Sequence, residues 1–252
     1  MTTATIRQIH QHGSVRSYKP DPVSPDMIRQ IVTAGQRAST SSNLQMYSVV
    51  VTTEEEKKSR LKELCNDQDH IAEAPIFMTW CADFSRLNRV CQHRGYELEA
   101  GYVENFLVAA VDCGIAMQNA GLAAESLGLG FCYIGAIRNN PREIIELFDL
   151  PKFVFPVSGM TLGWPKKPPR IRPRLPVEAV LHWESYDEND LQYLEEYDRA
   201  MIETGIYSGR QVKGDQLAEE SYGWMEHSAR RVSAPKRTHL KEVIQEAGFS
   251  LK

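Results

Sequence analysis

Three separated segments carry side chains that suit the binding of a phosphorylated ligand. Residues 12–16 (His-Gly-Ser-Val-Arg) supply hydrogen-bonding and cationic groups, and residues 39–43 (Ser-Thr-Ser-Ser-Asn) form a second polar cluster. Arg170, Arg172 and Arg174 alternate in the third segment, where an extended backbone would place them on one side, about 7 Å apart, in reach of a phosphate. Each segment also has a structural alternative, because serine and asparagine cap helices and turns, and basic linkers are often only solvated.

The glycines Gly128, Gly130 and Gly135 could be taken for a dinucleotide fingerprint. In that fingerprint the glycines follow a strand and open a helix, whose N-terminus meets the pyrophosphate. Here a predicted helix precedes them and a predicted strand follows. We therefore expect no Rossmann domain, and we expect Gly128 to end a helix.

Other catalytic chemistries find little support in the residue spacing. The chain has no nucleophile elbow and no HExxH motif, and Asp67 and Asp69 lie among solvent-friendly residues. The five cysteines are scattered, without a CxxC pair, so we expect neither disulfides nor a metal site, and Cys81 and Cys132 suit small buried hydrophobic residues. A reducing cytoplasm is the expected compartment.

The overall charge excludes two classes of partner. With 29 Lys and Arg against 33 Asp and Glu, the net charge is −4, which gives no attraction for nucleic acid or anionic lipid. The first residues contain no apolar signal region, and no run of about 20 apolar residues occurs, so we expect no membrane association.

These candidate binding residues must be positioned by helices and strands that are mixed along the chain without strict alternation. We expect a helix from Pro25 to about Arg37, with Ser24 as its N-cap, and a largely apolar helix over 102–127, buried on most sides and a candidate for a subunit interface. The polar exceptions on that helix are Asp112, Gln118, Asn119 and Glu125. Apolar runs predict strands over 46–53, 76–82, 131–137 and 154–162, and further helices are expected over 54–64, from Pro141, over 187–204 and over 240–247.

A proline-rich stretch over 165–176 divides the chain. Proline fixes φ and removes a donor, so this stretch must be extended and cannot lie in a helix or a central strand. A helix on so long an arm is best explained if the arm packs on another subunit. We therefore expect a core over 1–165, and an arm with C-terminal helices over 166–252 that packs on the partner of a homodimer.

Taken together, the sequence resembles the nitroreductase family, in the branch of oxygen-insensitive NADPH nitroreductases and flavin reductases. The resemblance runs over about residues 5–185, in the correct order, and is carried by HGSVRSY at 12–18, ASTSSNLQ at 38–45, QDHIAEAP at 68–75, CADFSR at 81–86, AAESLGLGFCYIGAIRNN at 123–140, GWP at 163–165 and RPRLP at 172–176. It implies an α+β fold, with a mixed, mainly antiparallel sheet flanked by helices, in an intertwined homodimer with two FMN sites at the interface.

The resemblance also implies roles for individual residues. His12 and Ser14 would lie near the ribityl phosphate, and Arg16 near the pyrimidine edge, where a cation would stabilise the anionic reduced flavin. Gln68 would read the pyrimidine edge, Arg172 and Arg174 would bind the phosphate, and the partner subunit would contribute Ser39, Thr40, Ser41 and Asn43. The backbone of Tyr133, Ile134, Gly135 and Ala136 would lie against the isoalloxazine ring near N5, where a side chain at Gly135 would crowd it.

Some positions depart from the family pattern. Family members usually carry arginine at the position of Gly13, glycine at Ala136 and often lysine at Arg172; Arg170 could partly replace the cation missing at Gly13. The segment 205–231 matches only loosely, and within it Arg210 and Lys213 are the candidates for contact with the 2′-phosphate of NADPH. The choice between NADH and NADPH is left open.

The implied activity is FMN-dependent reduction of nitro compounds, quinones or free flavin by NAD(P)H. The implied cycle is ping-pong, in which nucleotide and acceptor use the same open face in turn, so no protein residue is assigned as catalytic acid, base or nucleophile. Two alternatives are a specialised enzyme of this fold, such as a dehalogenase or a flavin-cleaving enzyme, and a flavin-binding redox sensor. The physiological acceptor is not predicted.

Overall fold

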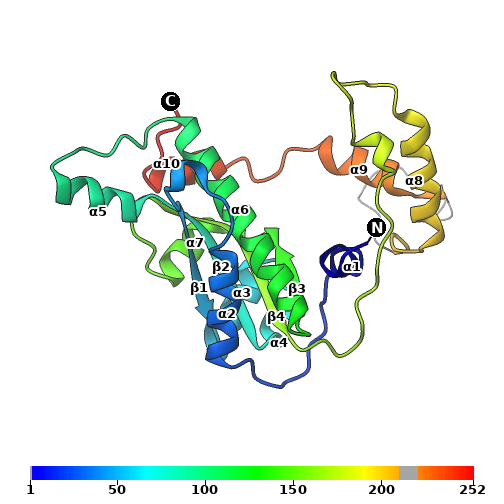
Figure 1. The fold of residues 1–252 in the computed structure, drawn as a ribbon, viewed down its shortest axis with the longest axis horizontal. Helices are drawn as coiled ribbons and strands as arrows, with labels where there is room; N and C mark the ends of the chain where they lie inside the picture. Colours follow the sequence, from blue (N-terminus) through cyan, green and yellow to red (C-terminus); the bar gives the residue numbers. More distant parts are fainter. Residues whose placement is uncertain (1, 210–220) are drawn as a thin grey trace. The chain divides into compact units, whose positions relative to one another are not determined.

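The centre of the structure is a four-stranded antiparallel sheet. It is a computed structural model, which describes residues 2–209 and 221–252. The strands β1 (Tyr47–Thr52), β2 (Ile76–Asp83), β3 (Gly130–Ile134) and β4 (Val154–Gly163) are arranged in the order β1-β2-β4-β3 (Figure 1). All three pairings are antiparallel, as expected for a mainly antiparallel sheet. β1 and β3 are therefore the two edge strands.

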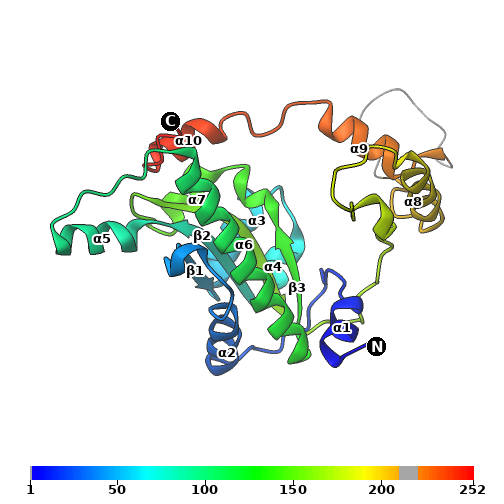
Figure 2. The ribbon, with the colours of Figure 1, turned by 45° about the horizontal axis from the view of Figure 1, so that its top comes forward.

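Helices cover both faces of the sheet. α2 (Pro25–Gly35) and α6 (Val103–Ser126) lie together on one face, as Figures 1 and 2 show. α3 (Glu55–Leu64), α4 (Asp69–Glu73) and α7 (Pro141–Leu147) contribute to the core on the other face. Side chains alternate along β2, so Met78 and Trp80 pack toward α6 whereas Phe77 packs toward α3. This two-sided burial explains the continuous apolar run at 76–82.

The helix ends predicted from the sequence are confirmed. The Ser24 hydroxyl accepts a hydrogen bond from the Met27 amide at 3.2 Å, and Pro25 occupies the first turn of α2. Gly128 follows α6 with a φ of +83°, and the amide of Leu129 donates back to the carbonyl of Ala124 at 3.0 Å. That left-handed termination turns the chain from α6 into β3.

The prediction that α6 is buried on most sides is wrong for the single chain. Of its most apolar stretch, 33% is buried, and one stripe at four-residue spacing is exposed, formed by Val103, Leu107, Val111 and Ile115. Among the described residues, α6 is also the one helix that is long and apolar enough to cross a membrane. Core helices of soluble proteins pass the same test, so this is weak evidence for a membrane span. The exposed stripe lacks a partner within the described chain.

The chain forms two compact units, of which the first is Met1–Arg170 together with Arg237–Lys252, and the second is Ile171–Lys236. α8 (Leu191–Glu203) and α9 (Trp224–Val232) belong to the second unit, and α10 (Leu240–Glu246) to the first. The amide of Phe153 donates to the carbonyl of Ala247 at 2.6 Å, and Phe249 is fully buried among core aromatic side chains. α10 thus packs in the first unit although it follows the second unit along the chain.

Several elements differ from the sequence-based expectation. β3 ends at Ile134, so the predicted strand to Ile137 is wrong; Gly135–Arg138 is a 3₁₀ helix, η2, that turns Ile137 into the core. Four helices were not predicted from the sequence, namely α1 (Ala4–His10), α4, α5 (Ser85–Arg94) and α9. The same holds for two 3₁₀ turns, η1 (Ser41–Asn43) and η3 (Val177–Ala179). From Pro168 to Pro176 the chain has neither helix nor strand, as the prolines predict.

Candidate active site

The segment 12–18 is docked against the edge strand β3. The amide of Val15 donates to the carbonyl of Phe131 at 2.9 Å, and the buried Tyr18 hydroxyl donates to the carbonyl of Val15 at 2.6 Å. Burial raises the pKa of Tyr18, which keeps the hydroxyl protonated as a donor. Because Gly13 and Val15 are buried in this extended segment, the alternating residues Ser14 and Arg16 are exposed. The buried residues of the segment thus pack against the protein, and its polar side chains are exposed and can contact a ligand.

His12 is held by a carboxylate from α6. Its Nδ1 lies 2.6 Å from Oε1 of Glu125, and its ring lies 5.1 Å from the ring of Phe131, measured between centroids. Both side chains are partly exposed, at 27% for His12 and 16% for Glu125. The contact fixes the imidazole of His12 at the same edge of the sheet as Ser14 and Arg16.

Gln68 lies in the turn before α4, on the sheet face that also carries η2. Its Nε2 donates to the carbonyl of Cys65 at 2.8 Å, which orients the amide. The pKa of the neighbouring His70 is lowered, mainly by burial and then by the positive charge of Arg16. Val15 and Tyr18, which flank Arg16, pack with Ala74 directly after α4, so the structure brings the segments of Arg16 and Gln68 to one region.

The segment Tyr133–Ala136 spans the end of β3 and the start of η2. The Tyr133 hydroxyl donates to Oε1 of Gln118 on α6 at 3.0 Å, and burial raises the pKa of Tyr133. Since that side chain is engaged by α6, the backbone is the part of Tyr133 left to contact a ligand. This backbone continues β3, the strand against which Val15 is docked, into the turn at Gly135.

Gly135 has no evident internal reason to be glycine. Its φ lies outside the left-handed region, and an added Cβ would meet no atom closer than the Arg138 guanidinium at 3.4 Å, an ordinary contact. By contrast, a Cβ at Gly13 would stand 2.8 Å from both the carbonyl oxygen of Arg170 and the Cβ of Pro169. The glycine at position 13 is therefore required by the close passage of the arm, which brings Arg170 next to it.

The cluster Ser39–Asn43 is not joined to these segments by any hydrogen bond within the described residues. It precedes β1, whereas Tyr133 lies on β3, and β1 and β3 are opposite edges of the sheet. The amide of Ser41 donates to Oδ1 of Asp112 at 3.0 Å, and Asp112 is 2% exposed. Ser42, Asn43 and Gln45 adopt positive φ values of 49°, 57° and 53°. Such strained conformations are kept by their surroundings and concentrate at functional sites.

The remaining predicted residues lie in the second unit or outside the described residues. Arg172 and Arg174 are exposed on the extended arm, and Nη1 of Arg174 donates to the carbonyl of Arg172 at 3.2 Å. Arg210 and Lys213 lie outside the described residues.

Comparison with known proteins identifies the family of the chain. Residues 9–164 match the model of the nitroreductase family, and residues 172–252 match the C-terminal domain of the same family. The chain belongs to the nitroreductase family.

Two curated relatives and one solved structure illustrate the similarity of this nitroreductase. It is 38% identical to the FMN reductase [NAD(P)H] of Bacillus subtilis over 98% of each chain. It is 35% identical to the oxygen-insensitive NADPH nitroreductase of Salmonella typhimurium, again over 98% of each. The NADPH:FMN oxidoreductase of Vibrio harveyi, solved in complex with NAD+, superposes with a TM-score of 0.88 at 31% identity, over 99% of this chain and 100% of that one.

Two acidic residues of this nitroreductase act on predicted site segments and were not predicted from sequence. Glu125 holds His12, and Asp112 holds the turn at Ser41. Both had stood out as polar exceptions on an apolar helix, which is the signal that could have found them. What the sequence lacked was the partner of each, which lies 113 residues away for Glu125 and 71 residues away for Asp112.

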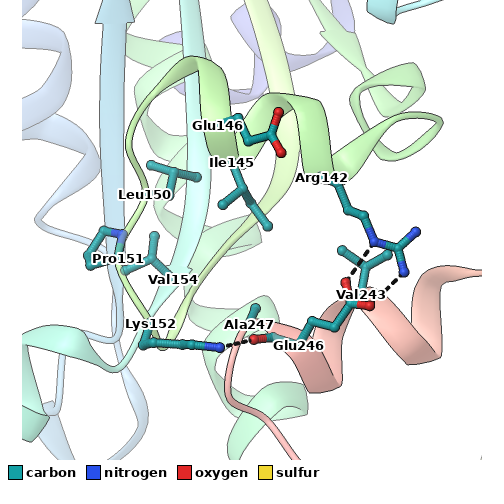
Figure 3. A pocket seen from close by; sticks show the side chains of 10 residues that line it. All are labelled: Arg142, Ile145, Glu146, Leu150, Pro151, Lys152, Val154, Val243, Glu246 and Ala247. Carbon is teal, nitrogen blue, oxygen red and sulfur yellow. Dashed lines mark hydrogen bonds and ion pairs between the residues drawn. The ribbon is translucent and has the colours of Figure 1, made fainter.

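A separate cleft of the nitroreductase contains none of the predicted site residues. It lies between α7, the start of β4 and α10, with a volume of about 350 Å³ (Figure 3). Nε of Arg142 pairs with Glu246 at 2.7 Å and Nη2 with Glu242 at 2.8 Å, while Lys152 donates to the carbonyl of Glu246. Because Arg142 and Lys152 bind residues of α10 across the cleft, we assign this region to the attachment of α10.

Proposed function

We propose that this nitroreductase is an FMN-dependent oxidoreductase that uses NAD(P)H to reduce nitro compounds, quinones or free flavin. The observation that carries the proposal is the docking of the segment 12–18 against β3, which presents His12, Ser14 and Arg16 at the edge strand that leads to Gly135. The names of the relatives, an FMN reductase and a nitroreductase, agree with it.

The residues present suit FMN. Ser14 and Arg16 are exposed and can contact a ligand. No other part of the described chain comes closer than 3.4 Å to the position that a Cβ at Gly135 would take, so a ligand can approach this backbone. His12 and Ser14 would bind the phosphate, and Arg16 and Gln68 the pyrimidine edge. When bound, FMN supplies the redox chemistry, while the protein binds it, orients it and places positive charge beside it.

Arg170 takes the place of the arginine that relatives carry at position 13. The backbone of Arg170 passes within contact of Gly13, so its side chain starts beside the vacated position. Together with Arg172 and Arg174, it gives the arm three cations for the phosphate. The close contact, which is made by the backbone at residue 170, accounts for the glycine at position 13.

The functional unit is a homodimer in which each site combines two chains. Ser39–Asn43 and Tyr133–Ala136 belong to opposite edges of one sheet, so a partner subunit is the simplest source of the second cluster. The exposed apolar stripe of α6, which ends near the Asp112-anchored turn, provides the surface for that contact. The five free cysteines suit a reducing cytoplasm.

Flavin binding and turnover test the proposal directly. We expect the purified protein to carry or take up FMN, seen as flavin absorbance, and to oxidise NAD(P)H with nitrofurazone, menadione or free FMN. A protein that gains no flavin absorbance on adding FMN would overturn the proposal. Flavin that NAD(P)H does not reduce in stopped-flow mixing would instead indicate a redox sensor, and reducible flavin without turnover of the three acceptors would indicate a specialised enzyme.

The dimer is tested by a charge on the stripe of α6. Ile115→Glu should give a monomer by sedimentation velocity, with loss of bound FMN, because a carboxylate would be buried in an apolar interface. The matched control is Val232→Glu, a change of similar size at an exposed position on α9. A wild-type chain that sediments as a monomer with FMN bound would refute the shared site.

A further inference from the structure

Glu125 is the charged residue that contacts the candidate phosphate-binding group His12. It lies near the end of α6, beside the small residues Ala123 and Ala124, and its carboxylate meets Nδ1 of His12 at 2.6 Å. At that distance the bond is short and charge-assisted. A carboxylate so close to an expected phosphate site requires a reason, because by itself it would repel the phosphate.

The contact determines how His12 can meet a ligand. Its Nδ1 proton is committed to Glu125, and the face of the ring rests near Phe131 at 5.1 Å. Nε2 makes no hydrogen bond within the described residues, so it is the ring nitrogen left for a ligand. Two contacts on different sides of the ring thus fix the direction in which Nε2 is presented.

The charge of Glu125 decides what Nε2 offers. A neutral imidazole with its proton on Nδ1 presents a lone pair at Nε2, which would repel a phosphate oxygen. With a proton on each ring nitrogen, Nε2 is a donor, while Nδ1 still donates to the carboxylate of Glu125. A ligand at Nε2 would then contact the protonated ring of His12, and the carboxylate of Glu125 would lie on the other side of that ring, at Nδ1.

We infer that Glu125 is a positioning residue that makes His12 a donor to the terminal phosphate of the flavin, and so selects FMN over riboflavin. The inference rests on the proposed function and deepens it by assigning the source of phosphate selectivity. A purely structural contact, comparable to the bond from Gln8 on α1 to the Leu122 carbonyl on α6, would affect FMN and riboflavin alike.

The test compares the two flavins on the full-length apoprotein, by titration with fluorescence detection. Glu125→Gln keeps an acceptor for the Nδ1 proton and removes the charge. We expect FMN to bind about tenfold more weakly, the scale of one charge-assisted hydrogen bond, and riboflavin to bind within about twofold of wild type by the same reasoning. An unchanged or increased ratio of FMN to riboflavin affinity would overturn the inference.

A double-mutant cycle separates positioning from a direct effect. In a His12→Asn background, Glu125→Gln should no longer change FMN affinity, because its action passes through His12. The matched control is Glu104→Gln, the same change at an exposed position on the same helix, which should leave both flavins unaffected. A further loss of FMN affinity in the His12→Asn background would contradict the role of Glu125.

A measurement on the wild-type protein covers the case in which Glu125→Gln does not fold. The ¹⁵N resonance of His12 Nε2 should move on adding FMN, as expected for a new hydrogen bond at that nitrogen, and stay in place on adding riboflavin. Equal responses to both flavins would overturn the inference. A wild-type protein that binds neither flavin would instead defeat the proposed function, so the two failures are distinguishable.

Discussion

At the scale of single residues, Arg16 offers the clearest test of the flavin assignment. It is exposed and forms no hydrogen bond or ion pair within the described residues, so its removal should leave the fold intact. Arg16→Ala should weaken FMN binding by about 10- to 100-fold, as expected for a lost bond to a charged group, and slow flavin reduction by NAD(P)H. The control is Arg29→Ala, another exposed arginine. Unchanged affinity and reduction rate would exclude Arg16 from the pyrimidine edge.

Substitution by alanine should have different effects at two glycines, on FMN affinity at Gly135 and on stability at Gly13. Gly135→Ala should keep the melting temperature, since its Cβ meets nothing closer than 3.4 Å, and should weaken FMN binding about tenfold by crowding the ring. Gly13→Ala should lower stability by about 1–3 kcal/mol, because its Cβ must displace the backbone of Arg170. Thermal melts of the apoproteins and FMN titrations provide the comparison. A destabilised Gly135→Ala would assign that glycine to folding.

Part of the candidate site could be predicted from residue types alone. His12, Ser14 and Arg16 follow one another in the sequence, and the structure keeps them on one docked segment. The roles of Glu125 and Asp112 were not predicted, because a polar residue on an apolar helix indicates that it has a partner but does not indicate which residue that partner is. Their roles come from long-range contacts that residue spacing does not encode.

At the scale of elements, predictability followed the strength of the apolar pattern. β2 and α6 were found because burial on both faces, or a long apolar run, marks the sequence. α1 contains no buried residue, α5 buries only Ser85, and α4 is a single turn, so none carries a helical stripe. The end of β3 was misplaced because Ile137 continues the apolar run while η2 turns it into the core.

The attachment of α10 makes an electrostatic prediction at this scale. Arg142 lowers the pKa of Glu246 below its ordinary value of 4.5, chiefly through a hydrogen bond. A lowered pKa stabilises the fold fully above the ordinary value, and this contribution is lost as the pH falls through the folded value. The melting temperature of wild type should therefore fall in that acidic range, while Arg142→Ala should begin lower and fall less steeply. Because the pair is exposed, high salt should reduce the difference.

At the scale of the whole molecule, the sheet order has a consequence for how sites are shared. Segment 12–18 docks on β3 at one edge, and Ser39–Asn43 precedes β1 at the other. If each FMN site takes one cluster from each subunit, a defect in either cluster removes both sites of a homodimer. A heterodimer that carries one defect per chain, however, has one site with both defects and one intact site.

Subunit complementation can therefore decide between a shared site and a site within one chain. Arg16→Ala and Ser39→Asp should each weaken FMN binding, the second because it adds a negative charge to the cluster that the partner contributes to the proposed site. Co-expressed with different tags and purified through both, the two chains should form heterodimers that bind FMN and oxidise NAD(P)H at part of the wild-type level. If each site were built within one chain, both sites of the heterodimer would carry a defect. Inactive heterodimers from two well-folded variants would therefore refute the shared site.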